Sequence, residues 1–102
     1  MSDQGIGKIS DIIHGRLRLG VMAYLANAEA ASFTELKSAL KVTQGNLSIQ
    51  MRKLEDAGYI EIKKAIVGRK PLTTIRLTNC GREAFAVYLE ALSGILGGAL
   101  KT

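Results

Sequence analysis

The chain has 102 residues, of which 47% are hydrophobic, with one cysteine, one histidine and no tryptophan. This length supports one domain with one core and leaves no room for a separate catalytic domain. The single cysteine excludes an intramolecular disulfide and, with the single histidine, a tetrahedral zinc site built from these residue types. Fourteen basic and nine acidic residues give a net charge of +5, which in so small a domain indicates a polyanionic partner.

The sequence indicates neither secretion nor a membrane partner. Residues 1–10 lack the apolar core of a secretory signal. The most apolar stretch, Ala84 to Leu100, is interrupted by Glu90 and three glycines, and it falls short of the roughly 20 apolar residues that a membrane span needs. We therefore expect a soluble, cytoplasmic protein.

The N-terminal third predicts an arm followed by a helix. Residues 1–8 contain two glycines and are expected to form a flexible arm. A helix is expected to follow this arm. Gly15 and Gly20 each disfavour a helix by about 1 kcal/mol relative to alanine, so the regular part of this helix is expected to begin near Gly15 or Arg16. Residues 27–31 are expected to be a short connection. The helix is predicted from apolar residues spaced by three and four, namely Ile9, Ile13, Leu17, Val21, Tyr24, Leu25 and Ala28.

Two short helices joined by a three-residue turn come next. Ser32 and Glu35 have the spacing of a capping box, which predicts a helix from Phe33 to Leu40. Thr43 is a second candidate N-cap, and it opens a helix from Gln44 to about Ala57 that ends before Gly58.

A hairpin and a long helix complete the chain. Residues 59–67 and 72–78 alternate in part and are rich in β-branched side chains, and residues 68–71 form a Gly/Pro turn between them. The last helix is expected to start between Asn79 and Gly81 and to reach Leu96 or beyond. This order predicts a mainly α fold with a small hairpin wing: a winged helix-turn-helix over residues 9–78 and a C-terminal dimerisation helix over residues 79–102.

The helix that starts at Gln44 has a face suited to reading DNA. A helix fits the major groove, where each base pair presents a distinct pattern of donors and acceptors. Leu47, Met51 and Leu54 fall on the buried side, and no acidic residue occurs between Gln44 and Lys53. Ile49 could contact a thymine methyl group, or it could be an ordinary surface hydrophobe. The candidate reading residues are Gln44, Asn46, Ser48, Ile49, Arg52 and Lys53.

The hairpin turn supplies a second candidate contact. Arg69 and Lys70 place two long cations on the turn, where they could reach phosphates or a narrow minor groove, although a basic turn can also be simply solvated. From Lys37 to Arg82 the chain has ten basic and three acidic residues, so the basic charge is concentrated in the predicted reading unit.

The last helix is more apolar than the small core requires. An uncovered apolar stripe of this length usually marks a partner surface, and a symmetric dimer is the commonest solution. Such a dimer would set two reading helices about 34 Å apart and predicts a pseudo-palindromic site. The candidate interface residues are Phe85, Tyr88, Leu89, Leu92 and Leu96.

Five segments of the chain carry a likeness to a known family: Ala31 to Leu36, Thr43 to Ser48, Leu54 to Ile60, Gly68 to Pro71 and Leu77 to Thr78. Together they resemble the winged-helix transcriptional regulators of the MarR/ArsR type, in particular their small single-domain members. The likeness spans roughly residues 13–92 and implies a homodimeric DNA-binding repressor or activator. It places Gln44, Asn46, Ser48, Ile49 and Arg52 at reading positions and Arg69 and Lys70 in the wing.

The chain also departs from these regulators. Phe33 to Leu40 lacks the cysteine-rich box of metal-sensing members, so we expect no metal and no cofactor. The chain has little spare length for the ligand cleft of the longer members, so a small-molecule effector stays open.

Other functions have weaker support. Cys80 could sense oxidants or be a small junction residue, and His14 could be a pH switch, a ligand or a surface residue. No Ser/His/Asp set, phosphate-binding glycine loop or carboxylate pair with a nearby base is present, so we expect no enzyme. The alternative is a protein–protein module that docks through the last helix.

Overall fold

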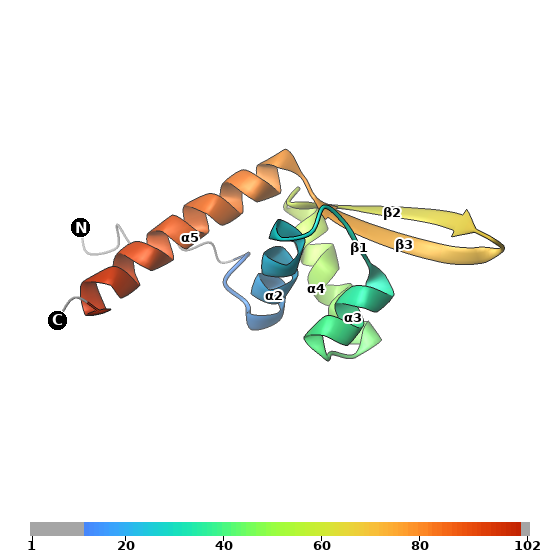
Figure 1. Ribbon diagram of the computed structural model, residues 1–102, viewed down its shortest axis with the longest axis horizontal. Coiled ribbons are helices and arrows are strands. Elements are labelled where there is room, and N and C mark those ends of the chain that lie inside the picture. The colour runs from blue at the N-terminus through green and yellow to red at the C-terminus, as the bar shows by residue number, and fades with distance from the viewer. Residues whose placement is uncertain (1–11, 101–102) are drawn as a thin grey trace.

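The computed structural model describes the backbone of residues 12–100 and the side chains of residues 12–97 (Figure 1). It confirms the predicted mainly α architecture with a β wing. The predicted arm, residues 1–8, and the first apolar position of the predicted first helix, Ile9, lie outside the described residues. The elements are α2 (Arg16–Ala26), β1 (Ala31–Ser32), α3 (Phe33–Leu40), α4 (Gln44–Asp56), β2 (Ile60–Val67), β3 (Lys70–Leu77) and α5 (Asn79–Leu100).

The core lies between α2, α3, α4, the first turns of α5 and the sheet. Leu47, Met51 and Leu54 are buried, which confirms the predicted inner face of α4. They pack in one cluster with apolar side chains of α2, α3, the sheet and α5. The hairpin and α5 project from this body in opposite directions (Figure 1), and the molecule is therefore elongated, with extents of 56 × 24 × 22 Å.

Both predicted helix caps are present. The Ser32 hydroxyl accepts from the Glu35 backbone N–H at 3.0 Å, and a Glu35 carboxylate oxygen accepts from the Ser32 N–H at 3.5 Å. The other oxygen accepts from the Tyr24 hydroxyl at 2.5 Å, and this hydrogen bond raises the pKa of Tyr24. The Thr43 hydroxyl accepts from the Asn46 N–H at 3.2 Å. These contacts fix the start of each helix of the pair.

The turn of the wing is shorter than predicted. Gly68 and Arg69 both have positive φ, 58° and 71°, as a two-residue type I′ hairpin turn requires. The predicted turn over residues 68–71 is therefore wrong at its C-terminal end, because Lys70 pairs with Val67 and Pro71 pairs with Ile66. Proline is tolerated there because β1 pairs with β3 only further along the strand.

A third strand lies where a connection was expected. Ala31 pairs with Ile75 and Ser32 pairs with Thr74, so the sheet has the order β1-β3-β2. The interpretation of residues 27–31 as a simple connection was wrong at Ala31. Two residues are too short to show an alternating pattern, and the pairing depends on a strand more than 40 residues away in the sequence.

The start of α5 lies directly against the backbone of the junction between α4 and β2. The Thr78 N–H donates to the Tyr59 carbonyl at 3.0 Å, and the Thr78 hydroxyl donates to the Gly58 carbonyl at 2.6 Å. A Cβ on Gly81 would lie 2.0 Å from the Tyr59 carbonyl oxygen, so only glycine permits this approach. The direction in which α5 leaves the body is therefore fixed at its first turn. Within the described part of the chain, no helix has the length and apolar character needed to cross a membrane.

We expect Gly81→Ala to lower the free energy of unfolding by about 1–3 kcal/mol, because the new methyl group overlaps a backbone oxygen. Gly94→Ala is the matched control, since nothing lies within 4 Å of the added carbon. That change should raise the free energy of unfolding by about 0.5–1 kcal/mol, because alanine favours a helix interior. Urea denaturation measures both. Equal stabilisation by the two substitutions would contradict the close approach.

Candidate nucleic-acid interface

The outer surface of α4 carries all six predicted reading residues. Each is exposed, and even the apolar Ile49 is 57% exposed. The helical period explains their exposure. Leu47, Met51 and Leu54 are buried on one face of α4, and the helix therefore directs these six positions towards solvent. The exposed residues are Gln44, Asn46, Ser48, Ile49, Arg52 and Lys53.

A groove separates one side of α4 from the wing. It has a volume of about 580 Å³ and is open to solvent. The groove brings Gln44, Ser48 and Arg52 together with side chains of the hairpin, whereas Asn46, Ile49 and Lys53 lie on α4 outside it. The part of α4 without acidic residues ends close to Arg52, since Glu55, three residues further along the helix, also lines the groove. The full lining is Phe33, Gln44, Ser48, Met51, Arg52 and Glu55 with Ile62, Lys64 and Thr73 of the wing.

Lys64 is a basic residue of this groove that was not among the predicted DNA contacts. The strand period accounts for its position, since Ile60, Ile62 and Lys64 occupy alternate positions of β2 and share one face. Ile60 is buried in the core, and Ile62 and Lys64 follow along the same face towards the tip and line the groove. The alternation alone could have identified Lys64 once Ile60 was assigned to the core.

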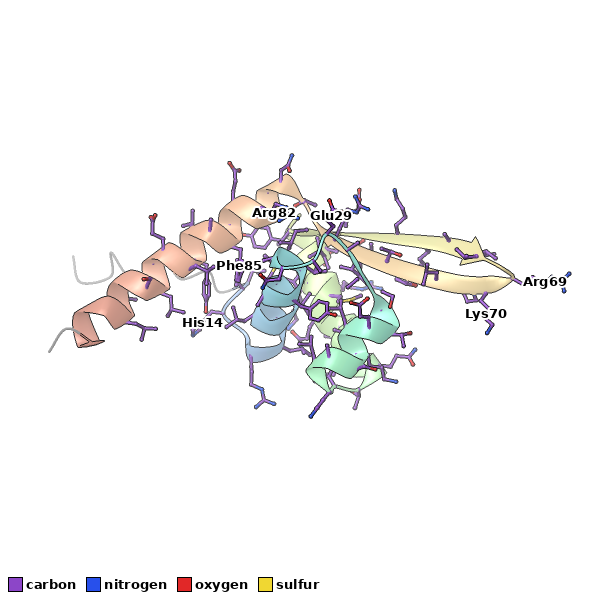
Figure 2. All side chains as sticks on the ribbon, viewed as in Figure 1. His14, Glu29, Arg69, Lys70, Arg82 and Phe85 are labelled. Atoms are coloured by element: carbon purple, nitrogen blue, oxygen red, sulfur yellow. The ribbon has the colours of Figure 1, made fainter. Side chains whose placement is uncertain are left out.

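The predicted wing cations lie at the end of the hairpin. Figure 2 shows Arg69 and Lys70 at the tip, far from the helical body. Both are exposed, and they are accompanied by exposed apolar side chains, with Ile66 at 78% and Val67 at 60% exposure. The tip therefore combines charge with apolar surface and projects away from the rest of the described chain.

Two of the predicted dimer residues belong to the core of the chain itself. Phe85 is 7% exposed and Tyr88 is 1% exposed, and their rings stack with centroids 6.2 Å apart. Because the first half of α5 packs on the body of the same chain, little of either side chain is left exposed for the predicted dimer interface. The Tyr88 hydroxyl lies 3.0 Å from Nδ1 of His14, which places His14 at a junction between the N-terminal segment and α5.

The second half of α5 keeps its apolar residues exposed. Leu89 is 45% exposed and Leu96 is 49% exposed, and Leu92 is half-buried between them. Together with Ser93 and Gly97 they line a shallow, mostly apolar hollow of about 320 Å³. This hollow is the part of the predicted interface that is available to a partner.

Metal-binding and thiol groups are sparse in the part of the chain that the structure describes. No group of three or more His, Cys, Asp or Glu residues there could hold a metal ion. Cys80 is a free, exposed thiol in the first turn of α5.

Three comparisons place this fold among known proteins. The family model for a winged helix DNA-binding domain matches residues 17–96. An uncharacterised protein of Methanocaldococcus jannaschii is 37% identical over 78 residues, which are 76% of this chain and 85% of that protein. The structure of a transcriptional regulator homologue from Pyrococcus horikoshii OT3 is 31% identical, with a TM-score of 0.88 over 94% of this chain and 97% of that one.

The fold is also similar to that of MarR. The MarR structure has a TM-score of 0.72 at 19% identity and is matched over 87% of this chain and 65% of that chain. The predicted resemblance to winged-helix regulators of the MarR/ArsR type is confirmed. The chain belongs to the winged helix DNA-binding domain family, and its fold is that of transcriptional regulators.

Proposed function

We propose that this protein is a sequence-specific regulator of transcription that binds double-stranded DNA as a homodimer. In this proposal α4 enters the major groove, and the wing contacts the adjacent backbone or minor groove. The observation that carries it is the groove between α4 and the wing, where polar and basic side chains of both elements converge on one exposed surface.

The charge and hydrogen-bonding groups of this surface are complementary to those of a DNA duplex. Arg52 of α4 and Lys64 of β2 line the two sides of the groove and supply positive charge for phosphates or for guanine. Gln44 and Ser48 add short hydrogen-bonding groups to the same side of α4, and such groups read base edges. Arg69 and Lys70 extend the basic surface to the tip of the wing (Figure 2), which suits contact with a neighbouring stretch of backbone.

A dimer formed through α5 would relate two copies of this DNA-binding surface by a two-fold axis. Leu89 and Leu96, which are exposed, and Leu92, which is half-buried, form an apolar stripe along the second half of α5. A stripe that pairs with its own copy buries both sets of side chains with one two-fold contact. Two reading helices related by that axis would favour an operator with inverted half-sites.

Selection from a random-sequence DNA pool tests specific binding directly. We expect enrichment of an inverted repeat whose half-site centres lie about one helical turn, or roughly 10 bp, apart. Binding without any enriched sequence, lost by about 200 mM salt, would reduce the interaction to charge attraction and contradict the proposal.

The roles of individual side chains can be separated by measuring how DNA binding depends on salt concentration and on DNA sequence. Arg69→Ala should weaken binding to every sequence and reduce the slope of log K against log salt by about 0.9, because one phosphate contact is lost. Asn46→Ala and Arg52→Ala should each cost about 1–3 kcal/mol at particular base pairs. Arg82→Ala, which removes an exposed cation from α5, is the control (Figure 2). If Arg69→Ala, Asn46→Ala and Arg52→Ala each lower the affinity equally for all DNA sequences, the assignment of base reading to α4 is contradicted.

Substitutions on α5 test the dimer. We expect the double variant Leu89→Gln, Leu96→Gln to shift the protein to a monomer in sedimentation equilibrium, because both exposed side chains belong to the apolar stripe. Val87→Gln is the control, since Val87 is 52% exposed on another side of the helix. An unsubstituted protein that sediments as a monomer would contradict the dimer. Specific capture of a different protein by the stripe, without specific DNA binding, would favour the alternative of a protein–protein module.

A further inference from the structure

A chain of side-chain hydrogen bonds links α2 to the exposed face of α4. The Arg18 guanidinium donates through Nη1 to Oε1 of Gln50 and through Nε to the Ile12 carbonyl, the latter at 2.6 Å. Nε2 of Gln50 then donates to Oδ1 of Asn46 at 3.4 Å. Gln50 is half-buried beside α2, whereas Asn46, one turn earlier on α4, is exposed.

The chemistry of arginine sets the direction of every bond in this chain. A guanidinium group has only donors, so the Gln50 amide must turn its oxygen towards Arg18. The nitrogen of Gln50 therefore faces Asn46, and Asn46 must accept with its own oxygen. The amide nitrogen of Asn46 is then the end left to a base. An asparagine without such a neighbour could present either end of its amide.

We propose that Gln50, held by Arg18, is a positioning residue that makes Asn46 present its amide nitrogen to DNA. Asn46 then favours guanine and thymine, whose major-groove edges carry only acceptors, over cytosine, whose edge carries only the N4 donor. Adenine carries both the N7 acceptor and the N6 donor, so it does not distinguish the two ends of the amide. This inference rests on the proposed function and adds to it a determinant of which base is read. Neither Gln50 nor Arg18 needs to touch DNA, because both act through Asn46.

Gln50→Glu is the most direct test. The carboxylate keeps one oxygen on Arg18 but turns its second oxygen towards Asn46, so Asn46 must rotate its amide to donate there. Asn46 would then present its oxygen to the base. In selection from a random DNA pool, we expect the preference at one position of each half-site to change from the acceptor-only bases, guanine and thymine, to the donor-only base, cytosine. The ratio of affinities for the two classes should change by about tenfold or more. The added charge lowers affinity for all sequences alike and leaves this ratio unaffected.

Further variants separate positioning from folding. Gln50→Leu keeps a side chain of similar size without hydrogen bonds, and it should flatten the preference at the same position while the other positions stay selective. Arg18→Lys retains a donor and should keep the wild-type preference, whereas Arg18→Leu should behave like Gln50→Leu. In an Asn46→Ala background, Gln50→Glu should cause no change in base preference. Thermal unfolding of each variant reports whether the fold is intact.

The outcomes distinguish the two proposals. If the unsubstituted protein selects an operator and Gln50→Glu and Gln50→Leu select the same bases at every position, the positioning role is overturned while the proposed function stands. If the unsubstituted protein enriches no sequence, the proposed function fails and the positioning role fails with it.

Discussion

The burial of one face of α4 is the constraint on which the rest of the site depends. Leu47, Met51 and Leu54 are enclosed by the core, and each such side chain contributes about 1.5–3 kcal/mol through removal from water. Because the helix rotates by about 100° per residue, fixing these three fixes the direction of every other side chain on α4. The same constraint turns Gln44, Ser48 and Arg52 to the groove and holds Gln50 beside Arg18 of α2.

The hairpin and α5 extend this organisation in opposite directions from the body (Figure 1). The tight turn at Gly68 and Arg69 sets the register of the wing, and that register places Lys64 rather than Lys63 on the groove side. At the other end, the contact of Gly81 with Tyr59 sets the course of α5. Arg69 and Lys70 therefore lie at one end of the molecule, whereas Leu89 and Leu96 lie on the helix that projects the other way, which gives the proposed DNA contact and the proposed dimer contact separate surfaces.

The division of α5 into a buried and an exposed half has a simple physical origin. The body is small, and it buries Phe85 and Tyr88 on the first turns of α5 and only part of Leu92 further along. Beyond those turns the apolar stripe continues with no neighbouring element of the described chain to cover it fully, so Leu89 and Leu96 keep nearly half of their surface exposed. One apolar stripe in the sequence is therefore divided in the structure between the core and an exposed surface.

The sequence by itself determined the elements whose signals are local. The capping residues Ser32 and Thr43, the period of α4 and the glycine at the hairpin turn each act within a few residues, and the helix pair and wing follow from them. Tertiary structure alone decided the pairing of β1 with β3, the burial of Tyr88 and the bond from Arg18 to Gln50. Each of these depends on a partner distant in the chain, and periodicity shows which face of an element is apolar without showing what covers it.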